Sequence, residues 1–415
     1  MDSVSEGVQG FVVRFHKCMQ EGFFSRLLIS QAMPPTEVAE PISIPPSDAK
    51  TEKSGKVYKK QIIWFNATMF ALLHLLALNG LRLAWQYPKT PNFWIGFWYS
   101  LVGGIGITAG YHRYWCHRTY KAKLPLRIFL MFLSGVAGQE DIFLWVRDHR
   151  LHHKYTDTDA DPYNISRGFF FAHMGWLMCR KHPEVLARGK EIDMSDVLAD
   201  PVVRFQRKYY FLIATFFVAV VPTLFCMYVL GYPLAVSFCY YGLFRYTLML
   251  HSAWTVNSLA HYYGYKPYDN GISSVENVLV GFLANGEGFH NYHHTFPYDY
   301  STSELSYYFN VTTLFIDFMA YIGQAYDRRR ADISFVKAKT TWVVVKEVLL
   351  AQVDGGVKEG WIAAAVGRCP DCSVEVDTEC GIGSAIRCGK LSKGVWMILQ
   401  DSAIEAFPTW TGAVL

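Results

Sequence analysis

The chain has 415 residues, of which 51% are hydrophobic and only 18% are charged, so a disordered or a fibrous protein is excluded. Aromatic residues make up 16% of the chain and the net charge is only +4. This composition suits a protein that meets a membrane interface, and it argues against nucleic acid as a partner.

Residues 1–56 are polar and contain two Pro-Pro pairs, and they lack the charged, then apolar, then small pattern of a cleavable signal. We therefore expect a disordered N-terminal arm. Long runs without charge follow, and they predict four transmembrane helices at about 61–82, 90–111, 209–230 and 233–253. The last two form a hairpin that turns at Gly231-Tyr232-Pro233.

Basic residues set the predicted orientation. Lysines and arginines gather before the first span, after the second and before the third, whereas the opposite loops carry only Arg82 and Lys89. Both termini and the polar middle of the chain are therefore expected on the cytosolic side. The apolar piece 126–138 is too short to span and predicts a buried or an interfacial helix.

Histidines carry the strongest functional signal. The chain has 14, and nine of them fall in four short clusters: His112 and His117; His149, His152 and His153; His261; and His290, His293 and His294. The two HxxHH triplets each place three imidazoles in one direction on a helix, which predicts a metal-binding face for each triplet.

The pair His112 and His117 is less simple, because five residues along a continuous α-helix turn by about 140°. These two histidines must flank a metal or bend around it. Asn257 and His261 are four residues apart and share a face. Nine histidines are too many for one centre, so we expect two metals with four or five ligands each, with iron preferred if the chemistry is redox.

Carboxylates are expected to orient the imidazoles, since neutral ligands leave the metal charge uncompensated. Five lie close to the histidine clusters in sequence: Asp148, Asp157, Asp159, Asp161 and Glu287.

Four segments resemble the motifs of the membrane acyl-CoA desaturases, the stearoyl-CoA desaturase family, with insect-like features. They are GITAGYHRYWCHR, WVRDHRLHHKYTDTDADPYNISRGFFFAHMGWLMCRKHP, NSLAHYYGYKPYD and NGEGFHNYHHTFPYDYSTSE, in the family's order and spacing. The similarity covers about 57–327, which we interpret as the desaturase domain.

The resemblance implies an all-α integral membrane protein with four transmembrane helices and a cytosolic helical cap that holds a di-iron centre. It implies two Fe²⁺ ions bound by the nine histidines above, with Asn257 reaching a metal through water, and no catalytic residue beyond these ligands. It further implies an O₂-dependent acyl-CoA desaturase of delta-9 or delta-11 type in the endoplasmic reticulum membrane, which receives electrons from cytochrome b5 and its reductase in trans.

The same resemblance places substrate contacts. The CoA end would lie on Asn66, Arg147, Asp148, Arg180 and Lys181, and the acyl chain would pass Gln139, Trp145 and Gly104. In membrane helices, however, a small residue such as Gly104 often only permits close helix packing.

Five residues depart from the family pattern and leave chain length and double-bond position open. Tyr111 stands where a small residue is usual, Tyr114 and Cys116 replace the common Leu and Ser, Glu140 stands where Asn is usual, and His251 also replaces Asn. His251 could be a packed polar residue or a group that orients a metal ligand.

The extension 328–415 does not resemble the family. It contains no histidine, so it cannot supply the axial pair of a fused cytochrome b5 domain, and the electron donor is expected in trans. Cys369, Cys372, Cys380 and Cys388 form a single CxxC with uneven partners, which is a weak zinc signal.

Two other functions stay open from the residues alone. A related di-iron hydroxylase would share the histidines but insert oxygen. A histidine-lined metal carrier would place its ligands at mid-membrane, whereas these clusters lie beyond the cytosolic ends of the predicted spans.

Overall fold

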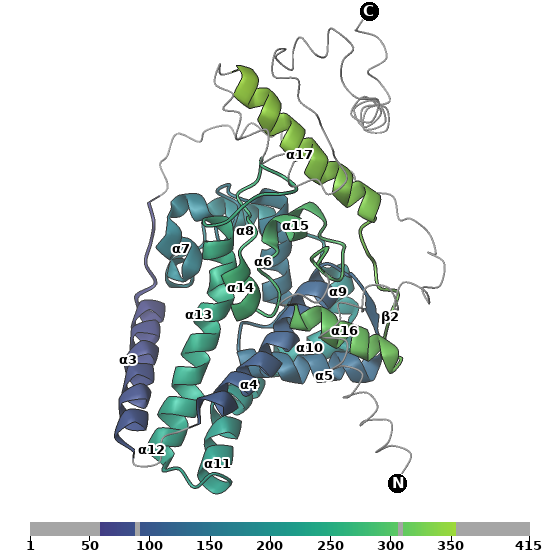
Figure 1. Cartoon of the computed structure of the whole chain (residues 1–415). Helices are drawn as coiled ribbons and strands as arrows, with labels where there is room; N and C mark the ends of the chain where they lie inside the picture. Colours follow the sequence, from purple (N-terminus) through teal and green to yellow (C-terminus); the bar gives the residue numbers. More distant parts are fainter. Residues whose placement is uncertain (1–58, 88–91, 306–309, 354–415) are drawn as a thin grey trace, which may run out of the picture. The chain divides into compact units, whose positions relative to one another are not determined.

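The computed structural model describes residues 59–87, 92–305 and 310–353. The predicted N-terminal arm and the cysteine cluster of the extension lie outside these residues. Helices dominate the described part of the chain (Figure 1), which confirms the all-α prediction. The strands in this part are β1 (Lys121–Ala122) and β2 (Ala325–Tyr326), which pair antiparallel.

Three of the described helices are long and apolar enough to cross a membrane. They are α3 (Trp64–Gln86), α4 (Phe93–Ile105) continued by the π-helix η2 (Gly106–Cys116), and α10 (Pro201–Thr215) continued by η5 (Phe216–Val220) and α11 (Val221–Tyr228). The helix of the second predicted span continues past residue 111 as the π-helix. The helix of the third begins at Pro201, where Asp200 caps it, and it is kinked at Tyr209, the predicted start of the span.

The fourth predicted span, 233–253, is also helical. It consists of α12 (Leu234–Val236), η6 (Ser237–Phe244) and α13 (Arg245–Ser258), which stands beside α3 (Figure 1). It is not among the three apolar helices, since Arg245 and His251 lower its hydropathy. The described residues therefore contain three spans by length and composition, or four if α5 and α6, bent by 83°, are counted as one.

The short apolar segment of the sequence forms α5 (Leu124–Ala137), which ends at Gly138 in the left-handed conformation, φ 58°. Asp141 then caps α6 (Ile142–Tyr155), because its carboxylate accepts a hydrogen bond from the Leu144 amide. The other described helices are α7 (Phe169–His173), α8 (Pro183–Gly189), α9 (Ser195–Ala199), α14 (Val278–Leu283), α15 (His290–Thr295), α16 (Val311–Tyr321) and α17 (Ile333–Val353), with 3-10 turns at η3 (Ile165–Arg167), η4 (Gly175–Met178) and η7 (Leu259–His261).

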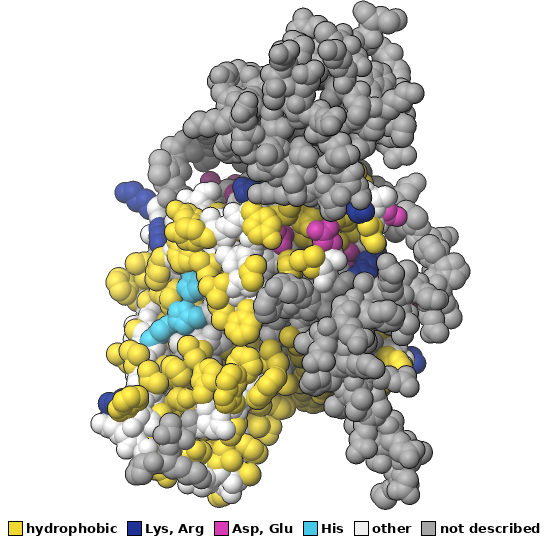
Figure 2. All heavy atoms as spheres, in the orientation of Figure 1, with side chains coloured by type: hydrophobic (Ala, Val, Ile, Leu, Met, Phe, Trp, Pro, Cys, Tyr) yellow, Lys and Arg dark blue, Asp and Glu magenta, His cyan; other side chains and the backbone are white. Residues whose placement is uncertain are grey.

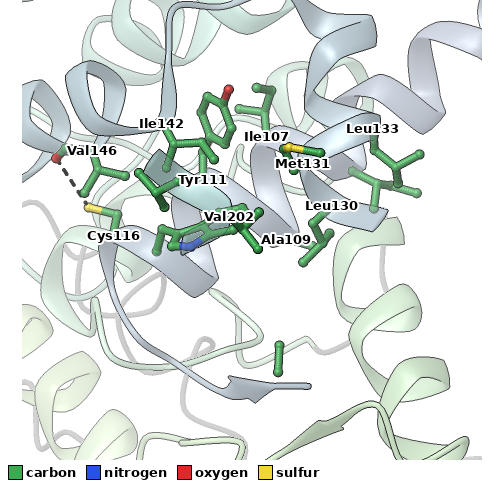
Figure 3. Close-up of a cluster of buried hydrophobic side chains, with 14 of the residues drawn as sticks. Ile107, Ala109, Tyr111, Cys116, Leu130, Met131, Leu133, Ile142, Val146 and Val202 are labelled. Carbon is green, nitrogen blue, oxygen red and sulfur yellow. Dashed lines mark hydrogen bonds between the residues drawn. The ribbon is translucent and has the colours of Figure 1, made fainter. Parts of the chain in front are cut away.

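The largest apolar core joins the π-helix η2 to α5, α6 and α10 (Figure 3). Leu130 and Ile142 are completely buried there, and the Cys116 thiol donates to the Val146 carbonyl at 3.9 Å. Gly106 permits the close approach of η2 to α5, because a Cβ atom at this position would lie 2.2 Å from the Ser134 nitrogen. This core fixes the helix ends that carry the histidines.

Candidate metal centre

The nine histidines of the four sequence clusters lie in two groups. The first group contains His112, His117, His149, His153 and His293, and the second contains His152, His261, His290 and His294. Within each group, one ligand nitrogen from every member lies within 4.8 Å of those of the others. The division into five and four agrees with the ligand count predicted for two metals.

Each HxxHH triplet divides between the two groups, so the expectation of one metal face for each triplet is wrong. On α6, His149 and His153 belong to the first group and His152 to the second. Residues four apart on an α-helix point within about 40° of each other, whereas adjacent residues differ by about 100°. The helix therefore presents its histidines to two centres at once, and α15 does the same with His293 opposite His290 and His294.

A π-helical turn brings His112 and His117 together. The His117 amide donates to the His112 carbonyl at 3.1 Å, which is a hydrogen bond from residue i+5 to residue i. The two imidazole rings lie 4.9 Å apart between centroids. The rotation expected for a continuous α-helix therefore does not apply, because η2 has more residues per turn.

Two of the five predicted carboxylates orient histidines. The His112 Nδ1–H group donates to Glu287 at 2.9 Å, and the His152 Nδ1–H group donates to Asp161 at 2.9 Å. Each group of histidines thus has one buried carboxylate partner. Asp157 contributes its backbone amide to Asp161, whereas Asp159 is exposed.

Arg113 is a buried residue of the site that the sequence reasoning missed. Its guanidinium is completely buried and donates to Glu287 at 2.9 Å, to the Tyr300 carbonyl and to the Thr313 hydroxyl. Burial alone would raise the pKa of Glu287, but His112 and Arg113 lower it to about 2. The only sequence signal was an arginine within a helix that continues from an apolar span.

Burial keeps most of these imidazoles neutral. It lowers the pKa well below 6.5 for His117, His149, His153, His261, His290, His293 and His294. Neutral imidazoles are the form that binds metal ions.

The nitrogen atoms converge as metal ligands do. The His293 Nε2 atom lies 2.9 Å from the Nε2 atoms of both His112 and His153, and His290 Nε2 lies 3.0 Å from His261 Nε2. A neutral imidazole has one N–H group, and His112 uses its own on Glu287, so its Nε2 atom presents a lone pair. The buried His117 Nε2 atom has no hydrogen-bond partner among the described residues. This donor set fits a pair of metal ions.

A cavity of about 720 Å³ borders both histidine groups, with His112, His149 and His290 in its wall. The wall is mostly aromatic and aliphatic, and it includes Gln139, Trp145, Gly104 and Asn257 from the predicted site. A Cβ atom at Gly104 would lie 2.4 Å from Asn285 Nδ2. Close packing therefore accounts for this glycine, although it also borders the cavity.

The residues predicted to hold the CoA end are not part of the cavity wall. The buried Asp148 carboxylate pairs with Arg147 at 2.6 Å and with Lys181. The Asn66 amide donates to the Leu177 carbonyl at 2.8 Å, and the Arg180 backbone amide donates to the Gln61 carbonyl.

The structure shows the contacts of Tyr111, Glu140 and His251, which depart from the family pattern. Tyr111 is buried, donates to the Glu140 carbonyl at 3.2 Å and accepts from Gln206. Glu140 borders the cavity in the left-handed conformation, and burial together with the nearby Asp148 raises its pKa to about 7. His251 contacts other histidines that belong to neither metal group.

Comparison with known proteins places the chain in a family. The model of the fatty acid desaturase family matches residues 88–313. Stearoyl-CoA desaturase 4 of Mus musculus is 50% identical over 288 residues, covering 69% of this chain and 81% of that protein. Stearoyl-CoA desaturase 5 of Homo sapiens is 51% identical over 281 residues, covering 68% and 85%. A delta(9)-fatty-acid desaturase of Caenorhabditis elegans is 50% identical over 281 residues, covering 68% and 83%. With two buried histidine groups beside an apolar cavity and these relatives, the chain belongs to the fatty acid desaturase family.

Proposed function

We propose that this protein is an acyl-CoA desaturase, which introduces a double bond into a fatty acyl chain and serves unsaturated fatty acid biosynthesis. The observation that carries the proposal is that an apolar cavity borders both histidine groups. The relatives named for stearoyl-CoA and delta(9) desaturation support this substrate class.

The proposed cofactor is a pair of iron ions, held by the nine histidines, with Asn257 contributing through water. Nitrogen-rich ligation suits iron, and the overall reaction needs redox chemistry. Bound iron would supply the activation of O₂ that removes hydrogen from an unactivated chain. Glu287 and Asp161 fix the orientation and tautomer of His112 and His152, which is the usual role of a carboxylate behind a metal-bound imidazole.

The protein's own contribution to the reaction is to position the acyl chain beside the histidine groups. The acyl chain lies in the cavity, where Trp145 and Gln139 border it beside His112 and His149. Arg147, Arg180 and Lys181 offer cationic groups for the CoA phosphates. The anchored end then sets which carbons lie beside the metals, so double-bond position follows from distance along the chain.

The overall reaction consumes O₂, two electrons and two protons for each double bond, and it yields two molecules of water. The proposed donor is cytochrome b5, acting in trans with its reductase. The proposed location is the endoplasmic reticulum membrane with both termini in the cytosol, because basic residues flank the spans on the side of the histidines.

Expression in a desaturase-deficient yeast tests the function. The expected result is rescue of growth without added unsaturated fatty acid and new monounsaturated lipids, with their double bonds located chemically. Lipids that gain oxygen instead of losing two hydrogens would assign the hydroxylase function. Normal product from a variant with alanine at His152 would contradict the metal-ligand role.

A further inference from the structure

Three further histidines form a hydrogen-bonded chain outside the two metal groups. His74 on α3, His251 on α13 and His173 on α7 are all half-buried. The His74 Nε2 atom lies 3.0 Å from His251 Nε2, and the His251 Nδ1 atom lies 2.9 Å from His173 Nε2. We call these three residues the histidine chain.

A backbone carbonyl fixes the direction of every bond in the histidine chain. His74 Nδ1 lies 2.6 Å from the Phe70 carbonyl, which can only accept, so His74 carries its proton on Nδ1. His251 must then donate from Nε2 to His74, and His173 must donate from Nε2 to His251. The remaining acceptor, His173 Nδ1, lies 2.9 Å from the Ser258 hydroxyl, whose single proton also has the Trp254 carbonyl as an acceptor at 3.0 Å. Neutral imidazoles therefore satisfy the two bonds between the three histidines.

The histidine chain lies between the cavity and an apolar face of the protein. His251, Phe70 and Trp254 all line the cavity, and Phe70 contacts Trp254 edge to face at 5.8 Å. On α3, Leu72 and Leu75 beside His74 are exposed. Figure 2 shows histidine side chains at the surface among hydrophobic ones. The histidine chain thus runs from the cavity wall at His251 to the apolar face of α3 at His74.

Helix α3 is packed firmly only in its second half. Its buried residues are Ala77, Gly80 and Ala84, and a Cβ atom at Gly80 would lie 2.3 Å from the Cys239 carbonyl oxygen. The first half contains no buried residue. The start of α3 is held by backbone hydrogen bonds from Ile63 to Met178 and from Arg180 to Gln61, and by the bond from Asn66 to Leu177. Between this anchor and Gly80, α3 meets α13 through Phe70 and the histidine chain, so an opening there would displace only the segment around His74.

Polar groups on an apolar face are costly and usually functional. Aliphatic side chains would seal the same wall without this cost, whereas each hydrogen bond between imidazoles favours the closed state and can break and form again. We propose that the histidine chain is a latch across a lateral window, through which the tail of the acyl-CoA moves between the cavity and the bilayer.

The proposal rests on the proposed function, and it names the acyl tail as the occupant because both sides of the window are apolar. The CoA end stays on the cytosolic side, where Arg147 and Lys181 lie near the cavity residue Glu140. The tail can then leave sideways and need not be drawn back along the cavity.

Two amide variants at His74 separate the latch from a general effect on folding. In His74→Gln the amide oxygen takes the place of Nε2 and accepts from His251. In His74→Asn the shorter amide reaches only the place of Nδ1, so His251 loses its acceptor. Loss of one such hydrogen bond shifts the equilibrium between closed and open by about two- to tenfold.

The measurement is the dissociation rate of labelled stearoyl-CoA from the full-length holoenzyme in nanodiscs, chased with unlabelled ligand in the absence of an electron donor. Hexanoyl-CoA, with the same CoA end and a short tail, is the matched control ligand. We expect His74→Asn to raise the stearoyl-CoA rate by about two- to tenfold and to leave the hexanoyl-CoA rate unchanged. His74→Gln should behave as the wild type for both ligands.

An equal change for both ligands, no change for either, or equal behaviour of the two variants would overturn the latch. A wild-type protein that binds stearoyl-CoA but forms no double bond would instead refute the proposed function. Unfolding temperatures of the two variants show whether the protein remained intact.

Discussion

Replacement of Asp161 by asparagine tests how the second histidine group holds its metal. The Asp161 carboxylate accepts three hydrogen bonds, from His152 Nδ1 and the Tyr163 amide at 2.9 Å and from the Asp157 amide at 3.0 Å. Asparagine keeps one oxygen but loses the charge that makes His152 a stronger ligand. Substitutions of such partners cost about 10- to 100-fold in metal affinity, or about 1.4 to 2.8 kcal/mol. We therefore expect Asp161→Asn to lose its iron at a chelator concentration about 10- to 100-fold lower than the wild type requires.

Glu287→Gln is the informative comparison, because Glu287 also neutralises Arg113. Its loss leaves a completely buried guanidinium without a carboxylate, which costs about 3 to 5 kcal/mol of folding stability. Chelator competition measures the iron affinity, and thermal unfolding in detergent measures the stability. Wild-type iron affinity in Asp161→Asn, or equal stability of Glu287→Gln and Asp161→Asn, would contradict these roles of the two carboxylates.

Three further results are expected. His293→Ala should form no product, as measured by lipid analysis, while its abundance in the membrane, measured by immunoblot, stays normal. Turnover at the wild-type rate would exclude His293 as a ligand. The pKa of Glu140 is raised to about 7, so its carboxyl gains a negative charge as the pH rises through this value. The KM for the anionic acyl-CoA should therefore rise between about pH 6 and 8 in the wild type but not in Glu140→Gln. Asp159→Asn, which changes an exposed carboxylate, is the control and should behave as the wild type. Gly106→Ala should lower iron affinity although Gly106 is not a proposed ligand, because the new Cβ atom would clash with the α5 backbone. Gly96→Ala should leave the affinity unchanged, because its Cβ atom would lie 3.5 Å from the nearest atom. Equal iron affinity in the two variants would contradict this prediction.

The sequence predicted the residues of the site better than their arrangement. The HxxHH spacing predicted that the six histidines of the two triplets form a metal-binding set, and all six lie in the two groups, because spacing alone encodes local helix geometry. It could not show that each triplet serves both groups, since this depends on how α6 and α15 face each other across the core. The first three predicted spans followed from apolar runs, whereas Arg245 and His251 make the fourth helix less apolar than its position suggested.

The spacing of residues along the sequence could not predict contacts between distant segments. Arg113 and Glu287 are 174 residues apart in sequence, and His74 and His251 are 177 apart. Neither pair has a periodic signal, because each is brought together only when the helices pack. His251 stood out as a departure from the family, but its partner on α3 could not be identified from the chain alone.

The π-helix η2 couples the membrane helix to the candidate metal centre. Because its turn is wider than that of an α-helix, His117 returns to the side of His112, five residues earlier, and the two imidazoles enter the same group. His112 and the next residue, Arg113, then reach one carboxylate, that of Glu287, from adjacent positions. An α-helical path through the same residues would turn His117 away by about 140° and remove one imidazole from the first group. The composition of the first histidine group therefore depends on the backbone of this helix as much as on the histidines, in keeping with the frequent occurrence of π-helical turns at functional sites.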